Sequence, residues 1–140
     1  MPRYAAERVL LAPLDDVWAF LAEPYNLADW WPGISGVEPD RRGLAAGARW
    51  KVIGPSRPGY FRRPQATGTL LVVDVVPGTR IAFELPADRI EAELTIGPAE
   101  GRRTRASLVV DAPFLLGFRG SLPSRALARL HDLLRTSEEI

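Results

Sequence analysis

The stretch GTLLVVDVVPGTRIAFELPADRIEAELTIGPAEGRRTRASLVV, residues 68–110, decides the fold of this 140-residue chain. It alternates apolar and polar residues with a period of two, which is the pattern of half-buried β-strands. Pro77-Gly78 and Gly101 interrupt the alternation and are typical of tight turns. The stretch therefore predicts an antiparallel meander with one solvated face, made of strands over 68–76, 80–85, 89–96 and 102–110.

The residues on both sides of the meander predict helices and further strands. Before it we expect a strand ending at Ala12-Pro13, a helix over 14–21, a short helix over 27–31 that Asn26 caps, and a strand over 48–53. After it, leucines at helical spacing predict a helix over 124–136. This order of elements predicts a single α+β domain over 1–140, in which a curved antiparallel sheet grips the last helix.

The composition excludes several kinds of site. The chain has no cysteine, which excludes disulfides and thiolate zinc sites, and its only histidine, His131, leaves no His pair for a metal. Eighteen basic and seventeen acidic residues give a net charge of +1, which argues against nucleic acid as a partner. Apolar runs stay well below the ~18 residues that span a bilayer, so stable membrane insertion is not expected. We expect a cytoplasmic protein with neither a metal nor an organic cofactor.

Several short motifs follow one another along nearly the whole chain. They are Ala12-Pro13, Val17-Trp18, Trp30 before Pro32-Gly33, the segment 73–81 with its Pro-Gly turn, Gly101–Thr104, and the leucine-rich final helix. In this order and spacing they resemble the START-like (SRPBCC) superfamily, in particular its polyketide cyclase/dehydrase-type members. The resemblance implies the helix-grip fold, with a seven-stranded antiparallel sheet curved around a long C-terminal helix and two short helices after the first strand. It also implies an elongated apolar cavity between sheet and helix, which such proteins use for lipids, polyketides and sterols.

Strand alternation indicates which side chains face the interior. If Asp74, Glu84 and Glu91 face water, the opposite parity points inward. That parity comprises Thr69, Leu71, Val73, Val75, Ile81, Phe83, Leu85, Ala92, Leu94 and Ile96. In the strand over 48–53 we expect Trp50 to point inward, with Arg49 and Lys51 on the other side. For most of these residues plain core packing is the better single explanation, and the cavity interpretation differs only in that some of them face a ligand.

The segment PFLLGFRG, residues 113–120, is the strongest pointer to function before the final helix. A loop with four large apolar side chains is buried under the sheet edge, closes over a pocket as a gate, or contacts a second copy of the chain. The loop over 54–64, with Tyr60 and Phe61, would form the facing lip.

These observations favour a protein that binds, transports or sequesters a small hydrophobic or aromatic molecule. The expected ligand contacts are Trp30, Trp50, Tyr60, Leu71, Val73, Phe83, Leu94, Phe114, Phe118, Leu127 and Leu130. No catalytic residue is assigned. One alternative is a cyclase or dehydratase, in which Tyr25, Tyr60, Arg49 or Arg119 polarises a carbonyl inside the cavity. Another is an interaction module or homodimer that uses the segment from Phe114 to Phe118.

Overall fold

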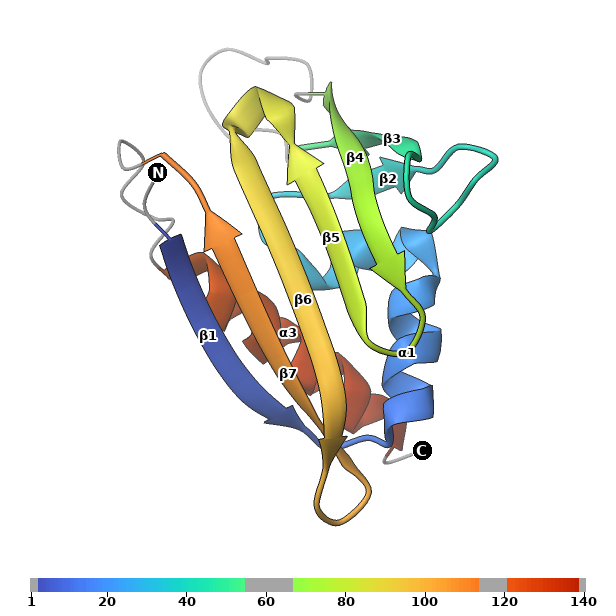
Figure 1. Ribbon diagram of the computed structural model, residues 1–140, viewed down its shortest axis with the longest axis vertical. Coiled ribbons are helices and arrows are strands. Elements are labelled where there is room, and N and C mark those ends of the chain that lie inside the picture. Colours follow the sequence, from blue (N-terminus) through green and yellow to red (C-terminus); the bar gives the residue numbers. More distant parts are fainter. Residues whose placement is uncertain (1–2, 55–66, 114–120, 139–140) are drawn as a thin grey trace.

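The computed structural model describes residues 3–54, 67–113 and 121–138 (Figure 1). Their elements follow the predicted order, with one additional short strand, β2 (Gly36–Glu38), that the residue pattern did not predict. The first half contains β1 (Arg3–Leu10), α1 (Leu14–Ala22), the 3-10 turn η1 (Pro24–Asn26), α2 (Leu27–Trp30), β2 (Gly36–Glu38) and β3 (Arg49–Ile53). The second half contains β4 (Thr67–Val76), β5 (Arg80–Leu85), the 3-10 turn η2 (Pro86–Asp88), β6 (Ile90–Ala99), β7 (Arg103–Asp111) and α3 (Leu122–Glu138).

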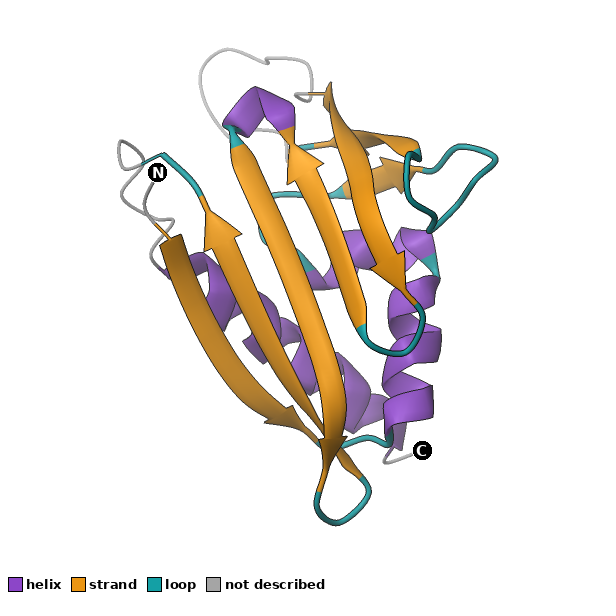
Figure 2. Cartoon of the chain, viewed as in Figure 1, coloured by secondary structure: helices purple, strands orange, loops and turns teal. Residues whose placement is uncertain are grey.

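Seven strands of the described residues form one antiparallel sheet in the order β1-β7-β6-β5-β4-β3-β2. The helices α1, α2 and α3 lie on the same face of this sheet, where α3 packs against β1 and β7 and α1 contacts β6 and β7 (Figure 2). The opposite face of the sheet is open to solvent. The predicted α+β helix-grip architecture is therefore confirmed.

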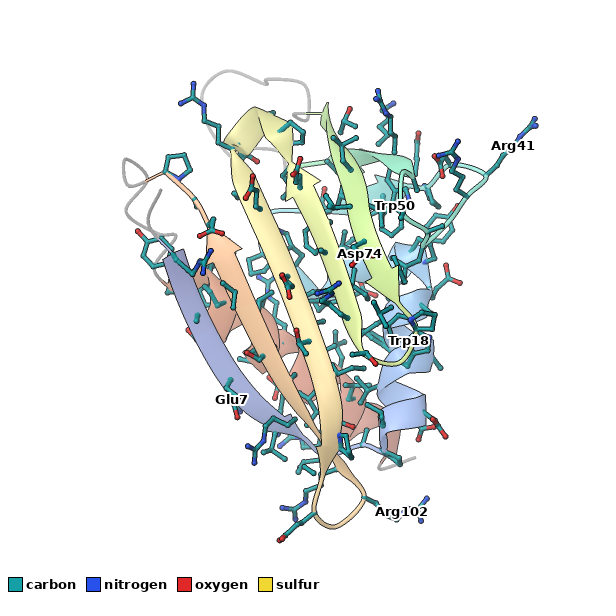
Figure 3. All side chains as sticks on the ribbon, viewed as in Figure 1. Glu7, Trp18, Arg41, Trp50, Asp74 and Arg102 are labelled. Atoms are coloured by element: carbon teal, nitrogen blue, oxygen red, sulfur yellow. The ribbon has the colours of Figure 1, made fainter. Side chains whose placement is uncertain are left out.

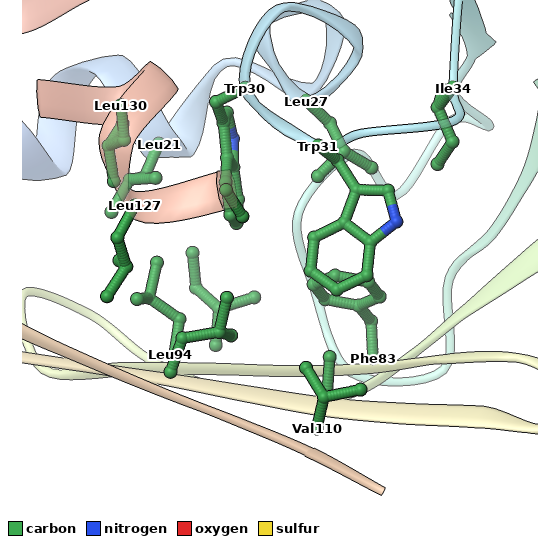
Figure 4. Close-up of a cluster of buried hydrophobic side chains, with 14 of the residues drawn as sticks. Leu21, Leu27, Trp30, Trp31, Ile34, Phe83, Leu94, Val110, Leu127 and Leu130 are labelled. Carbon is green, nitrogen blue, oxygen red and sulfur yellow. The ribbon is translucent and has the colours of Figure 1, made fainter. Parts of the chain in front are cut away.

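The predicted inward parity is correct for β5 and β6. Their inward side chains are 1–6% exposed, and they comprise Ile81, Phe83, Leu85, Ala92, Leu94 and Ile96. Across from them, Leu127 and Leu130 of α3 are 1% and 0% exposed, and these residues belong to one continuous core (Figure 4). The layer between these strands and α3 is thus packed with leucine side chains along most of its length.

The predicted parity of β4 is wrong over its first half. Leu70 and Val72 are buried at 0% and 2% exposure, whereas Val73 is 50% exposed on the outer face. The register between β4 and β5 shifts between Val72 and Asp74, so one extra residue of β4 is accommodated there. Because of this bulge, an alternation counted from Asp74 fails toward the N-terminal end of the strand. Thr69, Leu71 and Val73 face outward, and only Val75 of that set packs against the core.

Two polar side-chain contacts fix the segment between β1 and β2, one to β7 and one within the segment itself. The buried hydroxyl of Thr104 donates to the carbonyl of Ala12 at 2.8 Å, where β1 passes into α1. The side-chain amide of Asn26 donates to the carbonyl of Phe20 at 2.9 Å. Asn26 makes no side-chain capping bond to α2, so its predicted role as a cap is wrong, and it ties the end of α1 to α2 instead.

The outer face of the sheet carries charged pairs (Figure 3). Arg3 pairs with Asp111 at 3.1 Å and Arg105 with Glu7 at 3.4 Å, and Asp74 accepts from Arg80. Exposed pairs of this kind contribute about 0–1 kcal/mol each, so they solubilise this face more than they stabilise it. No helix in the described ranges is long and apolar enough to cross a membrane.

Candidate functional site

Two wide depressions of the described residues lie on the solvated face of the sheet. One of about 820 Å³ is lined by Arg103, Arg105 and Glu100 among others, and one of about 400 Å³ by Arg3, Glu84 and Asp111. Both are open grooves between charged side chains. Within the described residues no group of three or more histidines and carboxylates could hold a metal ion. An apolar ligand gains little in such grooves, because its surface would stay in contact with water.

A first enclosed space, here termed the inner hollow, lies between β3–β5 and the segment from α1 to α2. Its volume is about 20 Å³, enough for a single water molecule. Its described lining carries no titratable side chain and consists of Leu21, Pro24, Leu27, Trp30, Leu44, Trp50, Leu70, Val72, Ile81 and Phe83. None of these residues belongs to α3, so this space is displaced from the position that the helix-grip resemblance implies.

A second space, the helix-end hollow, lies at the N-terminal end of α3, is open to solvent on one side and has a volume of about 230 Å³. It does lie between the sheet and the C-terminal helix, because Leu85 and Ile90 of the sheet face Leu122 of α3 across it. Its described lining is mostly apolar and comprises Trp31, Pro32, Gly33, Ile34, Leu85, Asp88, Ile90, Leu122 and Arg125. Asp88 and Arg125 are its only ionisable side chains among these residues.

An aromatic cluster separates the two hollows (Figure 4). The ring of Trp31, which lines the helix-end hollow, meets the ring of Phe83, which lines the inner hollow, edge to face at 5.0 Å. Trp30 meets Trp31 edge to face at 5.8 Å. Each such contact is worth about 0.5–1.5 kcal/mol beyond the burial of the rings. The contact between Trp31 and Phe83 therefore forms the boundary between the two hollows.

The loop over 39–48 closes the inner hollow with Leu44. The carboxylate of Asp40 holds this loop, because its two oxygens accept from the backbone N–H of Arg42 at 3.0 Å and of Arg49 at 2.9 Å. Both bonds favour the charged carboxylate, as does the positive charge of Arg42, and together they lower the pKa of Asp40 despite the opposing effect of desolvation.

The same loop provides a hydrogen-bond acceptor for the buried indole N–H of Trp50. The indole N–H of Trp50 donates to the carbonyl of Gly43 at 2.8 Å, while its ring is 3% exposed. Gly47, at φ +89°, donates from its backbone N–H to the carbonyl of Val72 at 2.8 Å. The positive φ of Gly47 favours glycine there, whereas the guanidinium of Arg42, 2.8 Å from a β-carbon built at this position, belongs to a flexible side chain that can move away. The hydrogen bond from Gly47 to Val72 thus holds the loop over 39–48 against β4 beside the inner hollow.

The pKa of Asp40 makes the loop sensitive to acid. Its folded pKa lies below the ordinary value of 3.8, so it stabilises the fold above that value, and the stabilisation is lost as the pH falls through the folded pKa. We expect Asp40→Asn to lower the urea midpoint at neutral pH, and the difference from wild type to shrink toward pH 2. A difference that stays constant to pH 2, or an NMR titration of Asp40 with a midpoint above 3.8, would contradict this role.

The structure brings together part of the predicted site. Trp30, Trp50 and Phe83 line the inner hollow. Leu71 and Val73 are on the wrong face of β4, and the hollow is lined by Leu70 and Val72 in their place. Three further predicted residues are buried in the packed core and line neither hollow: Leu94, Leu127 and Leu130. The predictions for Tyr60, Phe114 and Phe118 fall outside the described residues.

Sequence reasoning raised Trp31 as a residue that could line the entrance or the wall, but did not include it among the expected ligand contacts. It is 1% exposed, contacts both neighbouring aromatic rings, and lines the helix-end hollow. The signal was present in the doubled tryptophan before Pro32-Gly33, since a short helix stopped by Pro-Gly directs adjacent side chains to different sides. Leu44 was also missed, because no periodicity marks a single residue of an irregular loop.

The residues that the enzyme alternative requires are not brought into either hollow where the structure describes them. Tyr25 is 62% exposed, and Arg49 is exposed on the outer side of β3. Tyr60 and Arg119 lie outside the described residues. His131 has its Nδ1 3.3 Å from Asp132 on the same helix and is absent from the lining of both hollows.

Comparison with known proteins assigns the chain a family and a fold. The family model described as "Polyketide cyclase / dehydrase and lipid transport" matches residues 1–135. No curated protein sequence matches the chain.

Among solved structures, an AHSA1-like protein from Aeromonas hydrophila has a TM-score of 0.75 at 16% identity, covering 98% of this chain and 94% of that one. A protein from Nitrosomonas europaea has a TM-score of 0.71 at 18% identity, covering 99% and 97%. A protein from Thermus thermophilus has a TM-score of 0.70 at 18% identity, covering 97% and 99%. At these identities the likeness shows a shared fold.

Proposed function

The chain belongs to the polyketide cyclase / dehydrase and lipid transport family, and on that premise we propose that it binds a small apolar molecule in its interior. The site comprises the inner hollow, the helix-end hollow and the aromatic cluster between them. The observation that carries this proposal is the described lining of the inner hollow, which has no titratable side chain and faces an enclosed space. Such a lining favours binding over acid–base chemistry.

The size of the hollows indicates how binding proceeds. Ligand sites commonly measure about 300–1,000 Å³, and the helix-end hollow at about 230 Å³ approaches that range by itself. The inner hollow becomes accessible only when Trp31 or Phe83 moves. A ligand therefore enters at the helix-end hollow, and a longer one replaces the contact between these two rings with contacts of its own.

This arrangement differs from the cavity that the resemblance implies. Leucines fill the layer between the sheet and most of α3, and Leu108 and Leu130 are both 0% exposed. The free space is confined to the end of α3 and to the side of α2. We infer that the ligand of this protein is compact.

Two adjacent residues of β4 provide a matched test. Val72 lines the inner hollow at 2% exposure, and Val73 points to solvent on the other face at 50% exposure. We expect Val72→Phe to fill the inner hollow and to weaken, by about tenfold or roughly 1.4 kcal/mol, the binding of ligands long enough to extend into it, because the phenyl ring occupies the space that such a ligand needs. Val73→Phe adds the same atoms outside the site and should leave affinity unchanged.

The measurement is a native mass spectrometry and tryptophan fluorescence screen with fatty acids, flavonoids and aromatic polyketides. A thermal melt of both variants separates loss of binding from loss of folding. Equal weakening by the two variants would place the ligand elsewhere, and binding of no member of the panel by the wild type would remove the support for the proposal.

A further inference from the structure

The polar groups of the helix-end hollow indicate what the ligand carries besides its apolar body. Asp88 lines this hollow and has an interaction partner of its own. The guanidinium of Arg125 lines the same hollow and has no ion pair or hydrogen bond within the described part of the chain. Arg125 is therefore an uncommitted donor, with a permanent positive charge, at the edge of an apolar space.

The indole N–H of Trp31 is a second uncommitted donor. The residue is 1% exposed, and this N–H has no acceptor among the described residues. Its nitrogen lies on the side of the ring that faces Ile34, another residue of the helix-end hollow (Figure 4). Among the described residues, Nε of Arg80 is the only fully enclosed side-chain nitrogen or oxygen that lacks a hydrogen-bond partner. The indole nitrogen of Trp31 is therefore not fully enclosed, and part of the small exposed area of Trp31 belongs to it.

Arg125 is exposed and the Trp31 nitrogen keeps some exposed area, so water satisfies both donors until an acceptor of the ligand replaces it. The two uncommitted groups are both donors, and one of them is cationic. The remaining wall contacts come from Ile34, Leu85, Ile90 and Leu122, all of which are buried. The chemistry that satisfies all of them is an acceptor-rich anionic head joined to an apolar body.

Resting on the proposed function, we propose that the ligand is a compact apolar carboxylic acid, with its carboxylate at Arg125 and an oxygen within reach of the Trp31 N–H. The helix-end hollow of about 230 Å³ holds roughly eight groups of the size of a water molecule, at about 30 Å³ each. An eight-carbon acyl chain or a phenyl-substituted short acid fits this volume. A long-chain acid fits only if Trp31 and Phe83 separate.

The test compares octanoate, octan-1-ol and octylamine at pH 7 by isothermal titration calorimetry. These three probes share the same alkyl chain and differ in the head group. We expect wild type to bind octanoate about tenfold more tightly than octan-1-ol, because a charge-assisted contact adds to the apolar contacts, and to bind octylamine most weakly. In NMR spectra, octanoate should shift the indole N–H signal of Trp31, which Trp31→Phe identifies by its loss.

Two arginines of α3 provide the control. Arg125→Gln should weaken octanoate about tenfold and leave octan-1-ol within twofold. Arg129→Gln removes the same charge from an exposed position of the same helix, outside the lining of the hollow, and should change neither ligand. Both positions are exposed, so both variants should fold.

The outcomes separate this inference from the proposed function. Equal affinity of wild type for octanoate and octan-1-ol, or equal effects of the two arginine variants, overturns the carboxylate head and leaves apolar binding intact. Failure of wild type to bind either probe at millimolar concentration overturns the inference and counts against the proposed function as well.

Discussion

Trp31→Ala is expected to lower the free energy of unfolding by about 3–5 kcal/mol, the range observed when a buried large aromatic side chain is removed. Trp31 is 1% exposed and contacts Phe83 at 5.0 Å and Trp30 at 5.8 Å between ring centroids. Its removal forfeits the apolar burial and both edge-to-face contacts, and leaves a void that the rigid strands cannot close. Urea denaturation followed by circular dichroism measures the effect.

The same substitution should alter ligand size selectivity. Without the indole, the helix-end hollow and the inner hollow become one continuous space, so bulky apolar ligands should bind Trp31→Ala more tightly than wild type. Trp18→Ala is the matched control, because Trp18 is only half-buried and lines neither hollow. If Trp31→Ala costs no more stability than Trp18→Ala, or leaves the preference for small ligands unchanged, Trp31 does not separate the hollows.

Leu130→Ala should be nearly as damaging, at about 2–5 kcal/mol. Leu130 is 0% exposed, in the layer between α3 and the sheet. Leu133 lies on the same helix and is half-buried, so Leu133→Ala should cost less than about 1.5 kcal/mol, with the same change in helix propensity. The free energies of unfolding of the two variants are compared through their urea midpoints, provided that the dependence of the free energy on urea concentration has the same slope in both.

This pair of variants decides where the free space lies. A residue that borders an existing hollow loses fewer contacts on truncation than one that is surrounded by protein atoms. If the space between sheet and α3 is filled, as the burial of Leu130 indicates, its truncation creates a new cavity and shows the full cost. Similar costs for Leu130→Ala and Leu133→Ala would instead indicate an unfilled gap along α3.

Strand alternation predicted the interior of β5 and β6 correctly and that of β4 incorrectly, and the reason is local. A β-bulge between Val72 and Asp74 changes the parity by one residue, and nothing in the apolar run LLVV distinguishes its two faces. Parity can be read from a sequence only where polar residues mark the solvated side. Glu84, Glu91 and Glu93 do so for β5 and β6, and β4 has only Asp74, at the bulge itself.

The fold was accessible from the sequence because many weak signals agree along the whole chain, from Ala12-Pro13 to the leucines of α3. The location of the free space could not be predicted from the sequence. Free space is a small difference between the volume that the backbone encloses and the volume that side chains fill. Trp31 and Leu44 illustrate this. One divides the space through its contact with Phe83, and the other closes it from a loop that Asp40 holds in place.

The most direct test of interior binding is to locate a bound molecule. Intermolecular NOEs, measured with the tightest-binding ligand of the panel, report which side chains lie within a few ångströms of it. The account predicts NOEs to Trp31, Ile34 and Leu122, and for longer ligands also to Phe83 and Val72. NOEs to Val9 and Ser107 in the groove on the outer face of the sheet, without any to Trp31, would contradict it.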